Sequence, residues 1–331
     1  MSIPALHQLR KEFPRAHIAI LARPWVGGLY GREPFCDELI PYEAPKGWHG
    51  LAQKWDVACE LRKRDFDCAV LLQNAFEAAA IAVLAGVPVR IGYNRDARGW
   101  LLTRPIPVPK PGETPRHQRF YYLELLKRAK LIPEYPTETS IRLFGAGAAA
   151  LQGVEHFRTA GLCKPVIGVS PGAAYGGAKR WLPERFAEAA VAVAQERNAA
   201  VAIFGSRQEV EVCETVREAV GNAGVTCINF AGRTELAQFI EMAAACEVYL
   251  TNDSGPMHIA SALGVPTVAV FGATDDEATG PTGDRSRIVR EPVECSPCLL
   301  RECPIDHRCM TRVSAARVAE SALSLIAAEK R

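Results

Sequence analysis

The feature that most constrains this chain is a regular alternation of short β-type runs and helical runs between residues 165 and 273. The β-type runs are VIGVSPG, AAVAIFGS, TCINFAG, EVYLTND and TVAVFGA. Helical runs connect them over residues 183–196, 209–220 and 235–245 and from Ser254 onward. Because parallel strands need crossover connections, which are usually helices, this pattern predicts a doubly wound parallel sheet. In such sheets the ligand binds at the carboxyl ends of the strands.

The first half of the chain shows the same alternation less regularly. It predicts buried strands at residues 17–23, 66–73 and 89–93 and helices over residues 76–85 and 117–129. The stretch RPIPVPKPGETP predicts an extended surface loop, and a second break is expected around residues 143–153. A chain of 331 residues is long enough for two domains, which we place at residues 1–150 and 151–331. The expected fold class is α/β.

Charge and hydropathy exclude several classes of protein. The net charge is only +2, so the chain lacks the basic excess of a general nucleic-acid binder. The longest apolar stretch, residues 78–89, is interrupted by Gly86 and Pro88 and is too short to span a membrane. The first residues show no basic region followed by an apolar one, so we expect a cytoplasmic protein with reduced thiols.

The segment TNDSGPMHIASALGVPTVAVFGATD joins a strand end to the start of a helix and has the layout of an anion site. Ser254 is a suitable N-cap, Gly255 allows close approach of the backbone, and Pro256 suits a first helical turn. The free N–H groups and the helix dipole favour a phosphate there, with His258 one turn further on. The alternative is that Asp253 and Ser254 only cap the helix.

Two further loops follow strands of the same predicted sheet. In VSPGAAYGGAKRWLPERF, small residues expose backbone amides while Lys179 and Arg180 supply positive charge, although the spacing matches neither GxGxxG nor a Walker loop. These two cations could equally belong to a solvated surface. In IFGSRQE, Glu209 could accept hydrogen bonds from a ribose or could complement the dipole of the following helix.

The segments SPGAAYGGAKRW, TNDSGPMHIASALGVPTVAVFGATD and CSPCLLRECPIDHRCM together resemble glycosyltransferase family 9. Weaker similarity in PALHQLRKEFPRAHI and GVPVRIGYNRDARGWLLT extends the resemblance over nearly the whole chain. It implies a GT-B fold, in which two Rossmann-like domains face a cleft. The acceptor-binding domain would be residues 1–150 and the sugar-nucleotide-binding domain residues 151–331. It further implies inverting transfer of heptose from ADP-heptose to the inner core of lipopolysaccharide, without a required cofactor.

The resemblance also assigns roles to residues of the second half. Lys179 would neutralise the donor phosphate, Asp253 and the following turn would hold the diphosphate or the heptose, and Glu209 would contact the ribose. A lysine and a helix N-terminus aimed at the leaving ADP can stabilise transition-state charge without a metal. The expected catalytic residues are Lys179, Asp253 and His258. The expected donor-binding residues are Ser170, Gly172, Lys179, Glu209, Asp253, Ser254, Gly255, Pro256, Met257 and His258.

One departure from the family concerns the start of the chain. The family begins with a strand and a loop whose Gly-Asp supplies the general base, whereas MSIPAL resembles the segment just after that loop. We therefore expect the first strand and the base to be missing and Met1 to be an internal methionine of a longer protein. The alternatives are a non-catalytic sugar-nucleotide-binding protein and a related transferase or epimerase that uses another sugar nucleotide.

The first half offers candidates for binding a lipid A-linked core oligosaccharide. Gln73 and Asn74 follow a predicted strand, and Arg95 and Arg98 follow another. Arginines bind phosphate and carboxylate groups through charge-assisted hydrogen bonds, so we expect Asn74, Arg95 and Arg98 to contact the acceptor. The alternative is exposed loop charge. A lipid-linked acceptor also implies peripheral contact with the inner membrane.

The second half ends in a cluster of four cysteines with His307 nearby: Cys295, Cys298, Cys303 and Cys309. Four thiols this close could bind zinc, but the spacing is unlike the usual separated CxxC pairs. Reduced packing thiols or redox-labile cysteines are the favoured interpretation. The other seven cysteines are expected to be small buried apolar residues.

Overall fold

The computed structural model describes all residues except 44–47 and 329–331 and divides into two compact units, Met1–Thr139 and Ser140–Arg331. The division falls earlier than the predicted boundary at residue 150. The reason is α6 (Ala146–Thr159), a helix that packs on α9 (Leu236–Ala244) of the second unit. The break expected around residues 143–153 was therefore wrong.

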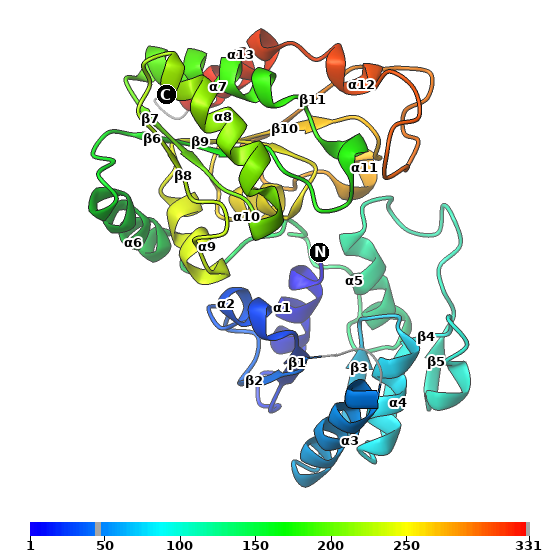
Figure 1. The fold of residues 1–331 in the computed structure, drawn as a ribbon. Coiled ribbons are helices and arrows are strands. Elements are labelled where there is room, and N and C mark those ends of the chain that lie inside the picture. Colours follow the sequence, from blue (N-terminus) through cyan, green and yellow to red (C-terminus); the bar gives the residue numbers. More distant parts are fainter. Residues whose placement is uncertain (44–47, 329–331) are drawn as a thin grey trace. The chain divides into compact units, whose positions relative to one another are not determined.

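The second unit is built on one parallel sheet with the strand order β11-β10-β9-β6-β7-β8 (Figure 1). Its strands are β6 (Val166–Ser170), β7 (Ala200–Ile203), β8 (Cys227–Asn229), β9 (Val248–Asn252), β10 (Thr267–Phe271) and β11 (Ser286–Arg290). The first of them, β6, lies between β7 and β9, so the chain winds outward from the centre in both directions. This confirms the doubly wound sheet predicted from the alternation of runs.

Helices cover both faces of this sheet, which explains its nearly continuous apolar strands. The helices α7 (Pro183–Arg197), α8 (Val210–Asn222) and α13 (Ala315–Ala328) share one core cluster with the strand side chains that face them. On the opposite face, Phe239 of α9 packs edge-on against Tyr249, and Met257 of α10 (Gly255–Ala262) packs against Ala269. Short helices α11 (Asp276–Thr279) and α12 (Arg308–Thr311) lie in the connections.

The first unit has parallel strands in two separate sheets, ordered β1-β2 and β3-β4-β5. The strands are β1 (Ala19–Ala22), β2 (Glu38–Pro41), β3 (Cys68–Leu71), β4 (Val89–Tyr93) and β5 (Arg104–Ile106). The main helices are α1 (Ile3–Glu12), α3 (Trp48–Lys63), α4 (Phe76–Leu84) and α5 (Arg119–Arg128), with a single turn at α2 (Gly27–Tyr30). Part of the loop expected in RPIPVPKPGETP is strand β5, whose Pro105 is tolerated because β5 is an edge strand.

The two sheets of the first unit are separate but share one apolar cluster. Ala19 and Leu21 of β1 and Ala69 of β3 pack against the same apolar cluster, yet the described residues provide no strand that pairs with both β1 and β3. Residues of β1 are half-buried, whereas those of β6 are all buried. Within the described residues, the strands of the first unit are therefore divided between two sheets, whereas those of the second unit form one continuous sheet.

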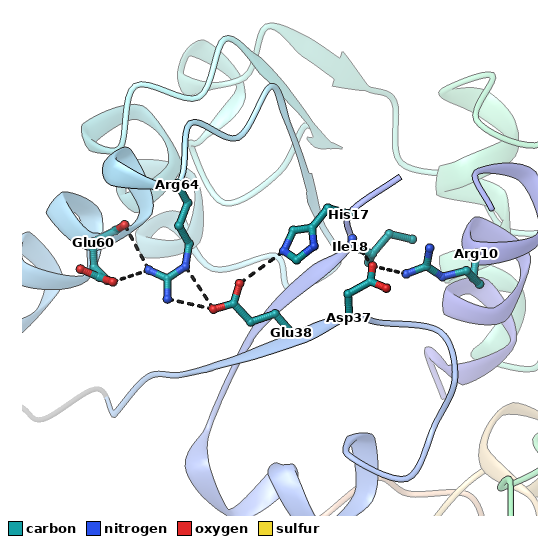
Figure 2. A network of polar contacts seen from close by, with 7 residues as sticks. All are labelled: Arg10, His17, Ile18, Asp37, Glu38, Glu60 and Arg64. Carbon is teal, nitrogen blue, oxygen red and sulfur yellow. Dashed lines mark hydrogen bonds and ion pairs between the residues drawn. The ribbon is translucent and has the colours of Figure 1, made fainter. Parts of the chain in front are cut away.

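Ion pairs fasten the edge of the β1-β2 sheet to its helices (Figure 2). Asp37 accepts hydrogen bonds from the Ile18 amide, at 2.8 Å, and from Arg10 of α1, and these contacts lower the pKa of its carboxyl. Arg64, just after α3, donates to Glu38 at 2.8 Å. His17 and Glu60 complete the network. All of it is solvent-accessible, so its contribution to stability is small.

In the part of the chain that the structure describes, none of the helices combines the length and the apolar character that crossing a bilayer requires.

The separation of β1 from β3 leads to a prediction for backbone protection. Among the described residues, each of these strands has a hydrogen-bonded neighbouring strand on one side only, so their amides are expected to exchange with solvent faster than those of β6 and β9. Hydrogen–deuterium exchange measured amide by amide tests this, with β8 as the edge strand of a continuous sheet for comparison. Protection of β1 and β3 equal to that of β6 would contradict the split sheet.

Candidate functional site

The two glycine-containing motifs come together because β6 and β9 are neighbours in the sheet. Ser170, the last residue of β6, is in register with Thr251 of β9. The loop after β6 and the turn after β9 therefore leave the sheet from the same edge, at the carboxyl ends of both strands. This is the position at which doubly wound sheets bind their ligands.

At this edge, Lys179 and Asp253 form an ion pair with 2.6 Å between Nζ and Oδ2. Lys179 belongs to the short 3-10 helix η3 (Gly177–Lys179), and its side chain is 14% exposed, against 5% for Asp253. The hydroxyl of Thr274, after β10, donates to the same Oδ2 at 2.6 Å. Oδ2 accepts hydrogen bonds from both Lys179 and Thr274. These bonds hold the carboxylate in one orientation and hold Lys179 at the carboxyl end of the sheet.

The buried side chain of Asn252 determines where the glycine-rich loop lies. Its Oδ1 accepts from the Trp181 amide at 2.9 Å, and its Nδ2 donates to the carbonyls of Pro171, at 2.7 Å, and Gly172, at 3.3 Å. Asn252 has no exposed surface. It therefore joins both ends of the loop that carries Lys179, a role that the sequence analysis missed. A polar side chain at the end of an apolar strand was the available signal.

Glu209 lies in the loop that follows β7, beside the loop that follows β6. In the turn η4 (Arg207–Glu209) its Oε2 accepts hydrogen bonds from the amide and the hydroxyl of Ser206, each at 2.8 Å, forming a capping box. Its Oε1 lies so close to Gly172 that a Cβ there would be 2.1 Å away. The helix-terminal position expected for Glu209 is confirmed, and its carboxylate also borders the loop after β6.

The start of α10 presents backbone rather than side-chain groups. Ser254 is the N-cap, but its hydroxyl makes no capping bond, so the purely capping interpretation is wrong for this residue. A Cβ on Gly255 would meet no atom within 4 Å, so packing alone does not require a glycine there. Met257 is fully buried in the core, while His258 is partly exposed one turn into the helix.

Ser170 is also less accessible than expected of a ligand contact. It is 2% exposed, and its hydroxyl lies 2.7 Å from the hydroxyl of Tyr249 beneath the sheet edge. Ser170, Met257 and Asp253 are buried, whereas Lys179, Gly255 and His258 are at least partly exposed.

The cysteine-rich segment, residues 295–309, lies against the glycine-rich loop. Among the described residues, no group of three or more His, Cys, Asp or Glu side chains could hold a metal ion, so the zinc interpretation gains no support. Cys309 is buried, and this burial, followed by the neighbouring thiols, raises its pKa. The expectation that the other cysteines are buried is wrong for Cys68 and Cys163, which are exposed.

In the first unit the predicted acceptor residues divide into two kinds. Arg98 is fully buried, and its guanidinium donates to the carbonyls of Tyr93, at 3.1 Å, and Gln73 and to Asn74 Oδ1, at 3.3 Å. Burial lowers the pKa of Arg98. Both predictions for Arg98, contact with the acceptor at the surface and exposed loop charge, were therefore wrong. Arg98 instead holds the ends of β3 and β4 together. Arg95 is exposed.

The Asn252 contacts lead to a prediction for stability. Asn252→Ala leaves a buried amide and two buried carbonyls without their partner and should lower the free energy of unfolding by about 2 kcal/mol. Urea unfolding followed by fluorescence measures this loss. The matched control is Asn222→Ala at the exposed end of α8, which should change stability by less than about 0.5 kcal/mol. Equal effects of the two substitutions would contradict the role assigned to Asn252.

Comparisons with known proteins agree with this fold. A family model described as glycosyltransferase family 9 (heptosyltransferase) matches residues 55–308. Lipopolysaccharide heptosyltransferase 2 of Salmonella typhimurium is 30% identical over 295 residues, covering 88% of this chain and 84% of that protein. Lipooligosaccharide heptosyltransferase 2 of Haemophilus influenzae is 30% identical over 296 residues, with the same coverage.

Solved structures show the same similarity in three dimensions. The structure of E. coli ADP-heptose lipopolysaccharide heptosyltransferase II has a TM-score of 0.82 and 27% identity, covering 100% of this chain and 95% of that chain. A family 9 glycosyltransferase from Veillonella parvula also has a TM-score of 0.82, at 23% identity, covering 98% and 92% of the two chains. With its paired Rossmann-like units of the GT-B type, this chain belongs to glycosyltransferase family 9 (heptosyltransferase).

Proposed function

We propose that this chain transfers heptose from ADP-heptose, with inversion, to the inner core of a lipid A-linked acceptor of lipopolysaccharide. In this proposal the second unit binds the donor and the first unit binds the acceptor. The observation that carries it is the Lys179–Asp253 pair beside the start of α10, at the carboxyl edge of β6 and β9. Family membership and the similarity to heptosyltransferases 2 supply the class of substrate.

The donor site supplies positive charge where the leaving group becomes more negative. When heptose departs, negative charge grows on the diphosphate of ADP. The ammonium of Lys179 and the amides at the start of α10 lie at one edge, and both stabilise that charge in place. Asp253 keeps Lys179 in position through Oδ2, and its Oδ1 accepts a hydrogen bond from a hydroxyl of the heptose. Glu209, held in place by its capping box, accepts a hydrogen bond from a hydroxyl of the ribose. These groups require no metal in the proposed reaction.

The acceptor half of the proposal rests on the first unit. Asn74 and Arg95 follow β3 and β4, and Arg98 holds the two loops together from beneath. The exposed guanidinium of Arg95 would bind a phosphate of the acceptor core. Because that acceptor is anchored in lipid, we place the enzyme in the cytoplasm in peripheral contact with the inner membrane.

The division of the strands of the first unit into two separate sheets favours a second candidate, a sugar-nucleotide-binding protein without transfer activity. Incubation with ADP-heptose and heptosyl-lipid A acceptor, followed by mass spectrometry of the lipid, separates the two candidates. A product heavier by one heptose supports transfer, and donor binding without product supports the second candidate.

The ion pair leads to a prediction for donor affinity. Lys179→Ala removes the cation expected at the diphosphate and should weaken ADP-heptose binding by about tenfold or more, as measured by calorimetry. Lys164→Ala is the matched control, because Lys164 is exposed and bonds to Asn198 away from the site. If both variants bind the donor as tightly as the unaltered protein, Lys179 does not belong to the site.

The carboxylate leads to a prediction for turnover. Asp253→Asn keeps the size of the side chain but removes its charge, so it should lower kcat by more than about tenfold at a temperature where the variant is still folded. Because Lys179 loses its partner, the melting temperature should also fall. The matched control is Asp284→Asn, whose side chain is 86% exposed. The test measures heptose transfer rates and melting curves for the unaltered protein, Asp253→Asn and Asp284→Asn. Turnover that survives in Asp253→Asn would exclude an electrostatic role for Asp253.

A further inference from the structure

The cysteine-rich segment is fastened to the glycine-rich loop at several points. The Ala178 amide donates to the Arg301 carbonyl at 2.9 Å, and the Gly177 amide donates to Glu302 Oε1 at 2.9 Å. The Tyr175 hydroxyl donates to the Leu299 carbonyl at 2.9 Å. Each bond joins the loop that carries Lys179 to residues more than a hundred positions later in the chain. The cysteine-rich segment therefore borders the loop that we propose binds the donor.

A glycine makes this close approach feasible. Gly176 has φ of +156°, and a Cβ there would lie 2.3 Å from the Arg301 carbonyl oxygen. His307 at the far end of the segment lies 3.1 Å from the Ala178 carbonyl through Nε2. The backbone of Arg301 is thus held directly against the loop.

This arrangement brings the side chains of Arg301 and Lys179 to the same aromatic ring, that of Tyr175. The Lys179 ammonium lies 4.9 Å from the centre of the Tyr175 ring, and the Arg301 guanidinium lies 5.3 Å from the same centre. Contact with an aromatic face holds a cation in place without using its hydrogen-bond donors. Two cations therefore flank a single ring at the edge where the donor diphosphate is expected.

The neighbouring charges set Arg301 apart from the other cations of the site. Lys179 is already paired with Asp253, and Arg180 donates to the Ala173 carbonyl through Nε and Nη2. The adjacent carboxylate, Glu302, accepts from the Gly177 amide. Arg301 itself is exposed, and the contact of its guanidinium is with the Tyr175 ring. Its donors can therefore serve a ligand.

We propose that Arg301 is a second diphosphate-binding cation of the donor site, so that the cysteine-rich segment contributes directly to recognition of the nucleoside diphosphate. This inference rests on the proposed function. A diphosphate carries oxygens on two phosphorus atoms and can accept from two cations at once. The planar fork of a guanidinium suits such oxygens better than an ammonium does.

The experiment measures binding of ADP and of AMP by calorimetry to the full chain. Arg301→Ala should weaken ADP binding about tenfold, Arg301→Lys should weaken it less, and the loss should be smaller for AMP, which lacks the second phosphate. The affinity of the unaltered protein for ADP should also fall more steeply with added salt than that of Arg301→Ala. Arg308→Ala is the matched control, because Arg308 lies in the same segment but pairs with Asp306 at 2.9 Å.

Two results would overturn the assignment of Arg301. One is ADP affinity in Arg301→Ala equal to that of the unaltered protein. The other is an equal loss in Tyr175→Phe, which keeps the ring but removes the bond to Leu299, because anchoring of the segment would then explain the effect. Failure of the unaltered protein to bind ADP would refute the proposed function and this inference together, whereas binding that is indifferent to Arg301 refutes only the latter.

Discussion

The pairing of β6 with β9 is the interaction on which the rest of the site depends. It places Ser170 beside Thr251, so that two loops distant in sequence leave the sheet together. Asn252, the next residue of β9, then binds both ends of the loop after β6. An arrangement of this kind is rigid because each buried polar group has a partner that it would be costly to lose. That loop in turn determines the position of Lys179.

The ion pair at this edge contributes little to stability. Lys179 and Asp253 are largely removed from water, and such a pair recovers little more than the cost of its own desolvation. Thr274 adds a hydrogen bond to the same carboxylate oxygen, which keeps the pair in one geometry. The cysteine-rich segment closes one side of the site and brings Arg301 near it. We propose that the diphosphate of the donor binds this set of cations and backbone amides.

Sequence patterns identified the elements of the second unit well and those of the first unit less well. The strands from β6 to β10 lie where their apolar runs predicted, because strands buried on both faces leave strong signals. The patterns missed the short strands β2 and β5, the edge strand β11 and the helices α1 and α13. They also mistook the beginning of α6 for a break. Arg98 was placed at the surface because the sequence does not show that carbonyls of a neighbouring loop surround it.

The sequence by itself determined the class of fold, the two glycine-containing loops and the family, because these depend on local periodicity and on motifs that stay contiguous. Only the tertiary structure decided which residues meet. The contacts between Lys179 and Asp253 and between Tyr175 and Arg301 join positions far apart in the chain. Such contacts depend on the order of the strands in the sheet and on which side chains are buried. No single segment of the sequence determines either, because the order of strands in a sheet follows from how all of them pack together.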